Sequence, residues 1–124
     1  MESVDGIGGF FFTASDAVGL SAWYANTLGV TAPPMSYDDE PWTQDAGPTV
    51  FAPFGAEQAD GPPVGPSGWG LNFRVRDLAA MVRQLRANGV DVEVDAAVYP
   101  NGRFALLHDP EGNPVQLWEP GTVT

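Results

Sequence analysis

The chain has 124 residues, enough for one compact domain, whereas a half of about 60 residues buries too little surface to be stable alone. It contains no cysteine and no lysine, which excludes disulfides, thiolate nucleophiles, sulfur-ligated metals and Schiff-base chemistry. Its net charge of -11 repels phosphate backbones, so we expect no nucleic-acid partner and interpret the acidity as a solvated surface, with cationic ligands as the alternative.

One motif occurs twice along the chain. Residues 7–16 and 68–77 are apolar runs that each end in an aspartate, and an apolar-periodic segment follows each of them. Gly9 in the first copy aligns with Gly70 in the second. The sequence therefore predicts two half-units that share a core or exchange partners.

The first half is predicted to contain one helix between strands. Residues 10–13 have the length and the aromatic content of a strand. The helix that follows ends at Gly29 and has one apolar face: Leu20, Trp23, Tyr24 and Leu28. Residues 30–54 have room for three more strands, but five prolines restrict these to short or edge strands.

The second half begins after a Gly- and Pro-rich linker, residues 55–68. Residues 71–75 are predicted as a strand, and Asp77 as the N-cap of a helix that ends at Gly89. The apolar stripe of this helix follows the i, i+3, i+4, i+7 pattern: Leu78, Met81, Val82 and Leu85. Three further strands are predicted, at residues 90–98, 104–108 and 114–118, which gives this half a βαβββ order.

These motifs resemble the glyoxalase/bleomycin resistance/extradiol dioxygenase group, also called the vicinal oxygen chelate (VOC) superfamily. The resemblance covers nearly the whole chain and is most specific in residues 76–78 (Arg-Asp-Leu), 85–90, 108–113 (His-Asp-Pro-Glu-Gly-Asn) and 116–119 (Gln-Leu-Trp-Glu). It implies an α+β fold in which two βαβββ modules curve their sheets around a cavity that often holds a divalent metal. The chain would then be a single VOC domain, residues 1–124, with modules at 1–54 and 69–124.

The metal-ligand positions of this family can be followed onto the chain one at a time. Its two histidine positions, each seven residues before a helix-opening aspartate, hold Gly9 and Gly70, and its glutamate position holds Gln116. The carboxylate that some members use at the end of the first half has no counterpart in residues 49–54. Because the chain has one histidine, it cannot build a two-histidine site by itself. We therefore predict a member without the usual metal ligands and expect no metal or other cofactor.

Strand parity predicts which side chains line the cavity, because alternate residues of a strand share a face. With the family's metal positions on the cavity side, the two glycines would form a floor that leaves space for a flat molecule. The predicted ligand-binding residues are Phe11, Thr13, Asn72, Arg74, Phe104, Leu106, Gln116 and Trp118, while Trp42 and Phe51 either join this wall or pack elsewhere. Aromatic walls with a few polar groups suit a small organic ligand.

Several of these residues also have a purely structural interpretation. Arg74 either recognises a ligand or pairs with Asp77 or Glu93. Gln116 either hydrogen-bonds a ligand or holds the cavity closed. Histidine is the side chain that titrates nearest neutral pH, so His108 is the acid/base candidate, or else a structural histidine before the turn that follows it.

Three functions remain open. The leading hypothesis is metal-independent binding of a small aromatic organic molecule or natural product, similar to the drug-sequestering resistance proteins of the superfamily. The second is a metal-free isomerase, cyclase or lyase with His108 as the proton carrier. The third is a metal-dependent glyoxalase- or dioxygenase-type enzyme with unusual ligands.

The surroundings of the protein are predicted from the same sequence. The resemblance implies a homodimer, whose modules pair either within one chain or across two chains. No apolar run approaches the ~20 residues of a membrane span, and the first five residues lack the basic start of a signal peptide. We therefore expect a cytoplasmic protein without a membrane partner.

Overall fold

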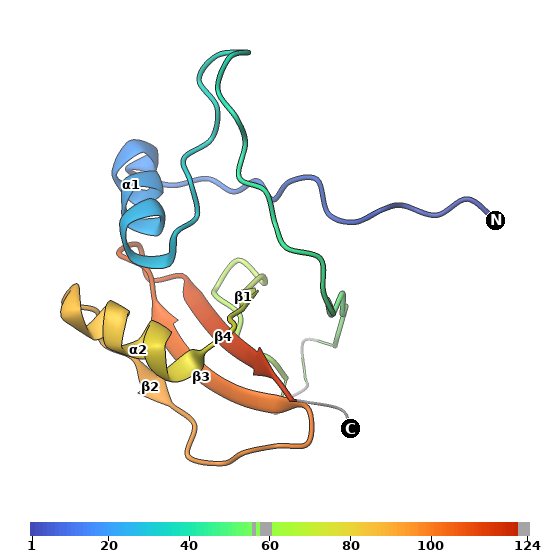
Figure 1. Cartoon of the computed structure of the whole chain (residues 1–124), viewed down its shortest axis with the longest axis vertical. Helices are drawn as coiled ribbons and strands as arrows, with labels where there is room; N and C mark the ends of the chain where they lie inside the picture. The colour runs from blue at the N-terminus through green and yellow to red at the C-terminus, as the bar shows by residue number, and fades with distance from the viewer. Residues whose placement is uncertain (56, 58–60, 122–124) are drawn as a thin grey trace.

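The computed structural model describes residues 1–55, 57 and 61–121. Its elements are, in chain order, α1 (Ala17–Leu28), β1 (Leu71–Arg74), α2 (Leu78–Ala87), β2 (Glu93–Val94), β3 (Gly102–His108) and β4 (Pro114–Pro120). The strands form one sheet in the order β1-β4-β3-β2, in which β1 is parallel to β4 and the other neighbours are antiparallel. Both helices lie on the same side of this sheet (Figure 1). The second half thus has the predicted βαβββ order, and the α+β class is confirmed.

Each helix begins at the predicted aspartate and ends at the predicted glycine. The side chains of Asp16 and Asp77 accept hydrogen bonds of 2.9 and 3.0 Å from main-chain N–H groups three residues further on. These bonds satisfy N–H groups that have no partner inside the helix. Gly29 and Gly89 lie at the two C-termini with φ of 74° and 77°, a left-handed conformation that glycine adopts most easily.

The hydrophobic core lies between the helices and one face of the sheet. Its buried side chains are Leu20 and Tyr24 of α1, Leu78, Val82 and Leu85 of α2, and Ala105, Leu107, Val115 and Leu117 of the two central strands. Alternate residues of β3 and β4 therefore point toward the helices. The residues between them point to the opposite face of the sheet.

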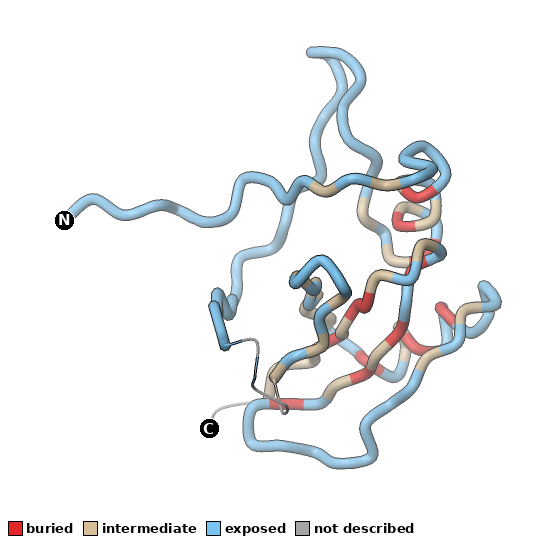
Figure 2. The backbone as a smooth tube through the Cα atoms, turned by 180° about the vertical axis from the view of Figure 1, so that it is seen from behind, coloured by how far each residue is buried: buried red, intermediate tan, exposed pale blue. Residues whose placement is uncertain are grey.

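The first half contains α1 and no strand in the part of the chain that the structure describes. Residues 1–16 are extended, and residues 30–54, which we call the arm, project beyond α1 before returning toward the sheet (Figure 1). Both segments are exposed over most of their length (Figure 2). The strands expected at residues 10–13 and within the arm therefore have no partner strand among the described residues. A strand needs a neighbour for its N–H and C=O groups, and the five prolines of the arm offer no N–H.

Hydrogen bonds hold α1 against the second half. The Glu111 carboxylate, in the turn between β3 and β4, accepts bonds of 2.7 and 2.9 Å from the N–H groups of residues 15 and 16. The Tyr24 hydroxyl of α1 donates a bond of 2.7 Å to Asp109 in the same turn. The first helix is thus attached to the second module through this turn. No described helix has the length and apolarity needed to cross a bilayer.

Candidate ligand-binding face

The face of the sheet away from the helices carries two rows of side chains, because residues in register on neighbouring strands share a face. We call these six residues the open face: Arg74, Trp118 and Phe104 in the first row, and Asn72, Gln116 and Leu106 in the second. They come from three strands and all belong to the predicted ligand-binding residues. The fold therefore brings together residues that are up to 46 positions apart along the chain, from 72 to 118.

Two aromatic rings form the apolar part of the open face. Phe104 and Trp118 are stacked, with 6.4 Å between ring centroids and 5° between ring planes. Tyr99 packs edge-on against Phe104 with a centroid distance of 5.9 Å. Both residues are half-buried, and near-parallel rings at the surface of a sheet offer a flat molecule an aromatic surface.

The indole of Trp118 is fixed in place by its neighbours. Its Nε1 donates a hydrogen bond of 2.8 Å to the main-chain oxygen of Asn101. Gly102 makes this position accessible, since a Cβ atom there would lie 2.8 Å from the indole nitrogen. The φ of Gly102, 133°, is also a conformation that side-chain-bearing residues rarely adopt.

The polar part of the open face consists of two amides and a guanidinium. The Nδ2 of Asn72 donates a hydrogen bond of 2.7 Å to the Oε1 of Gln116. The Nη2 of Arg74 donates a bond of 2.9 Å to the main-chain oxygen of Asp45, which ties the arm to β1. The structure thus gives Arg74 a partner other than Asp77 or Glu93, and places it beside the rings.

The space expected beside Gly70 is already filled. A Cβ atom at this residue would overlap the main-chain oxygen of Pro63 in the linker. A Cβ atom at Gly9 would lie 2.9 Å from the ring of Phe11. The idea that the two glycines leave room for a flat molecule is therefore wrong for Gly70, because the linker backbone occupies that room.

The other predicted wall residues lie away from the open face. Phe11 and Phe51 are 94% and 87% exposed, and Thr13 is also exposed. Trp42 packs edge-on against Phe73 at a centroid distance of 6.3 Å, on the side of β1 that faces the helices. Within one chain, these residues do not join the cluster of six.

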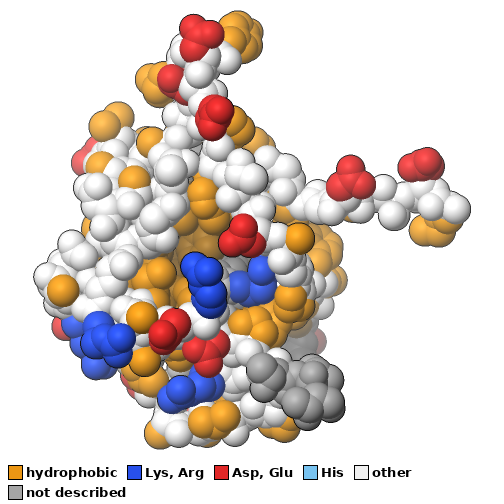
Figure 3. Space-filling view, in the orientation of Figure 1, with side chains coloured by type: hydrophobic (Ala, Val, Ile, Leu, Met, Phe, Trp, Pro, Cys, Tyr) orange, Lys and Arg blue, Asp and Glu red, His pale blue; other side chains and the backbone are white. Residues whose placement is uncertain are grey.

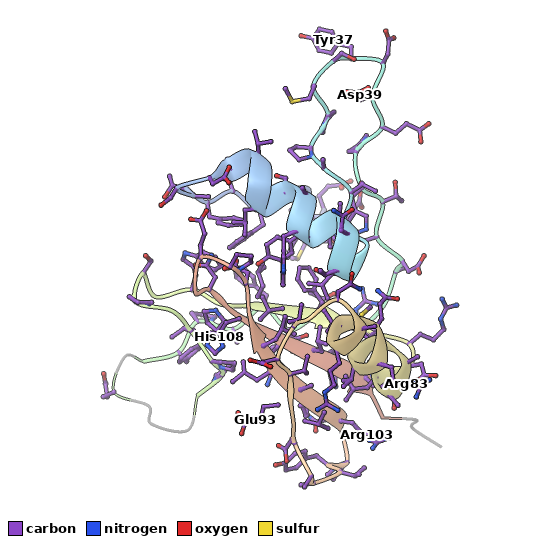
Figure 4. All side chains as sticks on the ribbon, turned by 90° about the vertical axis from the view of Figure 1, so that its left-hand side faces the viewer. Tyr37, Asp39, Arg83, Glu93, Arg103 and His108 are labelled. Carbon is purple, nitrogen blue, oxygen red and sulfur yellow. The ribbon has the colours of Figure 1, made fainter. Side chains whose placement is uncertain are left out.

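His108 lies at the end of β3 remote from Phe104, about 13 Å along the strand at about 3.3 Å per residue. It is exposed and borders two shallow grooves of about 720 and 350 Å³, both also lined by residues 89–91. Glu93 of β2, labelled with His108 in Figure 4, lines the larger of the two grooves together with it. The predicted acid/base candidate is therefore separated from the rings of the open face.

Sequence reasoning missed the residues that support the open face. Asn101 holds the indole of Trp118, Tyr99 packs on Phe104, and Asp45 receives Arg74. Asn101 and Asp45 contribute main-chain oxygens and Tyr99 lies in a loop, so no periodic pattern of side chains predicts these contacts. The glycine at position 102, between the loop and β3, was the available signal for a close approach.

A family model for the glyoxalase-like domain matches residues 9–118, which is most of the chain. The chain belongs to this family. The match includes the unpaired segments of the first half as well as the sheet and both helices.

Solved structures place this glyoxalase-like domain among similar folds. TnmS3, an antibiotic binding protein from Streptomyces sp. CB03234, aligns over 98% of this chain and 100% of its own, with 19% identity and a TM-score of 0.61. A glyoxalase/bleomycin resistance protein from the same source is 36% identical over 40% of this chain, which spans 43% of that protein, with a TM-score of 0.37. A glyoxalase family protein from Bacillus anthracis is 26% identical over 53% of this chain and 51% of its own, with a TM-score of 0.39. No curated protein matches the chain.

The donor groups at the family's metal positions do not fit a metal ion. Gly70 has no side chain and is covered by the linker, while the Gln116 carbonyl accepts a hydrogen bond from Asn72. Among the described residues, no three or more histidine, cysteine or carboxylate side chains converge as metal ligands. Divalent metals in proteins are held by imidazole, thiolate or carboxylate groups, and these positions offer none.

Proposed function

We propose that this glyoxalase-like domain binds a small, flat aromatic molecule or natural product on its open face, as a sequestering protein that needs no metal. The observation that carries the proposal is the stacked pair of Phe104 and Trp118 directly beside two amides and an arginine. Binding sites for small organic molecules combine apolar and aromatic walls with a few polar groups that set orientation.

The fold of a similar protein supports the same proposal. TnmS3 is an antibiotic binding protein, and its fold aligns with nearly all of this chain. At 19% identity the likeness concerns the fold, and the ligand of this domain is set by its own side chains. Those side chains favour stacking and hydrogen bonding over acid/base chemistry, because His108 lies at the far end of β3.

We further propose that the domain works as a cytoplasmic homodimer. The sheet ends at β1, so one edge of β1 faces no other strand among the described residues. Extended segments with exposed phenylalanines lie in the first half, and the arm and the N-terminal segment carry hydrophobic side chains away from the body (Figure 3). Unpaired edges and large exposed apolar groups are features that a second copy would cover.

Binding is tested with a panel of flat aromatic compounds of two to four fused rings. A ligand that binds only the folded state raises the melting temperature. At a concentration of 100 times its Kd it adds about 2.7 kcal/mol to the free energy of unfolding. Calorimetric titration of each hit should then show Trp118→Ala binding about fivefold more weakly, since stacking on an aromatic ring is worth about 1 kcal/mol. Trp42→Ala is the control, because Trp42 packs on Phe73 away from the open face.

Other outcomes would replace the proposal. Hits that bind Trp118→Ala as well as the wild type would place the ligand elsewhere. Turnover of a hit that disappears in His108→Ala would indicate an enzyme rather than a binder. One equivalent of tightly held metal, in protein purified without chelator, would contradict metal independence.

A further inference from the structure

The two amides of the open face are arranged as a pair. Asn72 on β1 and Gln116 on β4 are in register, and a hydrogen bond of 2.7 Å joins the Asn72 nitrogen to the Gln116 oxygen. Asn72 is exposed and Gln116 is half-buried, so the pair lies at the surface of the sheet. The stacked rings occupy the adjacent row, about 7 Å along the strands, which is two residues.

An inventory of donors and acceptors shows what this pair leaves available. A primary amide has two N–H donors and a carbonyl oxygen with two lone pairs. The bond between the two residues uses one N–H of Asn72 and one lone pair of Gln116. The Asn72 oxygen and the Gln116 NH2 group make no other hydrogen bond within the described chain. The pair therefore presents the carbonyl oxygen of Asn72 and the NH2 group of Gln116 on two residues in register, besides the second N–H of Asn72 and the second lone pair of Gln116.

This inventory does not depend on how the oxygen and nitrogen of each amide are assigned. With both amides turned over, the bond would run from Gln116 to Asn72 and would still leave one carbonyl and one NH2 group available. A ligand edge that satisfies both groups needs a donor beside an acceptor. A fused lactam has this edge, because its N–H and C=O are neighbours in one ring.

We propose that Asn72 and Gln116 read the polar edge of the ligand, and that the ligand class is a flat aromatic lactam or an equivalent ring with a donor beside a carbonyl. The inference rests on the proposed function, since the same ligand would stack against Trp118 and Phe104 in the neighbouring row. A site built to hydrogen-bond a ligand group discriminates strongly against an analogue that lacks the group, because its own polar groups are then left without partners.

The experiment compares two probes that differ in a single donor: phenanthridinone and N-methylphenanthridinone. Both are flat and aromatic and carry the carbonyl, but only the first has the lactam N–H. Calorimetric titration of the full chain should show phenanthridinone binding about tenfold more tightly than its N-methyl analogue. In Asn72→Leu, which removes the oxygen that accepts the lactam N–H, the ratio of the two affinities should fall to about one, while N-methylphenanthridinone keeps its wild-type affinity within about threefold. Gln116→Leu removes the donor to the carbonyl that both probes carry, so it should weaken both probes by a similar factor.

The controls separate the inference from the proposed function. Gln84→Leu, which removes an amide on α2, should keep the wild-type preference. If both probes bind the wild type equally, the reading of the polar edge is overturned and aromatic binding stands. If the preference survives in Asn72→Leu, another residue accepts the lactam N–H and the assignment is wrong. If neither probe binds, both the inference and aromatic binding at this face are overturned. Because Asn72 is exposed, its variant tests the idea even where Gln116→Leu fails to fold.

Discussion

Asp109 is a charged residue inside the described core, with 4% of its surface exposed. Its carboxylate accepts hydrogen bonds from the Tyr24 hydroxyl at 2.7 Å, from the Asn113 side chain at 2.8 Å, and from the N–H groups of residues 111 and 113 at 2.9 and 3.0 Å. A buried carboxylate is tolerated when donors surround it. Asp109, in the turn between β3 and β4, therefore also fastens α1 to the sheet.

Tyr24→Phe removes one of these donors and leaves the packing intact. We expect a loss of about 1.5 kcal/mol in the free energy of unfolding, because a hydrogen bond to a charged group is removed from a buried site while Asp109 keeps its other donors. Urea denaturation measures the loss. Tyr37→Phe is the control, since Tyr37 projects from the tip of the arm (Figure 4) and its variant should match the wild type. Equal stability of the Tyr24 variant would contradict the role of the bond.

The same tyrosine predicts a dependence of stability on alkaline pH. Burial, followed by the hydrogen bond to Asp109 and its negative charge, raises the pKa of Tyr24 above the ordinary value of 10.0. The folded state thus keeps a proton that the unfolded state releases, so this contribution to stability is complete below about pH 10 and is lost as the pH rises further. Above pH 10, the free energy of unfolding should fall less steeply with pH for Tyr24→Phe than for the wild type. Parallel curves would exclude this linkage.

Gly102 and Gly89 allow the cost of positive φ to be separated from the cost of steric overlap. Both have positive φ, but a Cβ atom at Gly102 would overlap the oxygen of Glu119 and press on Trp118, whereas nothing lies within 4 Å of one at Gly89. We expect Gly89→Ala to cost about 1 kcal/mol of stability and Gly102→Ala clearly more, with a changed tryptophan emission spectrum. Similar losses in both variants would show that the close approach at Gly102 has little effect.

At the scale of elements, the two helices have the same caps but different attachments. Asp16 and Asp77 both cap a helix through the N–H three residues on. The segment before α1 is held by the Glu111 carboxylate of the second half, whereas the first N–H of α2 donates to Glu119 within its own module at 2.9 Å. The docking of α1 therefore depends on a contact between residues 95 and 96 positions apart.

Glu111→Gln should loosen α1 without unfolding the sheet. The amide can accept one hydrogen bond through its oxygen, but its NH2 group faces an N–H donor where the carboxylate had a second acceptor. We expect hydrogen exchange of residues 17–28 to accelerate about fivefold, equivalent to about 1 kcal/mol, with little change in β3 and β4. Glu93→Gln, an exposed carboxylate on β2, is the control. Uniform acceleration throughout the chain would indicate global destabilisation instead.

At the scale of the molecule, the second half is a packed unit and the first half is spread around it. Figure 2 shows the buried residues concentrated in the helices and the central strands, with the arm and the N-terminal segment exposed. Two contacts hold the arm to the two sides of β1. Arg74 of β1 bonds to Asp45 of the arm, and Trp42 of the arm packs on Phe73 of β1. The arm therefore passes beside the free edge of the sheet, where a second copy would complete the proposed homodimer.

Replacing Phe11 and Phe51 together by serine tests the proposed homodimer. Both side chains are almost fully exposed in one chain, so the double variant should leave the stability of an isolated chain nearly unchanged. If a second copy covers them, light scattering coupled to size exclusion should show a dimer for the wild type and a monomer for the variant, and the wild-type melting temperature should rise with protein concentration. A monomeric wild type would contradict the dimer.

The sequence alone was sufficient for the local features and for the family. The aspartate caps, the glycine stops and the apolar stripes depend on neighbours three or four residues away, so they predict α1 and α2 directly. Alternation along β3 and β4 predicts which residues share a face, and the structure brings six predicted residues together on that basis. These features are encoded within short stretches of chain, where periodicity can be counted.

Only the tertiary structure decided the contacts between distant segments. The linker oxygen against Gly70, the bond from Trp118 to Asn101 and the packing of Trp42 on Phe73 each join residues whose spacing no period describes. The missing strand pairs of the first half have the same cause, because a strand is stabilised by a partner edge that its own sequence does not specify. Local sequence thus determined the helices and the residues of each strand face, whereas the contacts that support the open face depended on how the chain closes on itself.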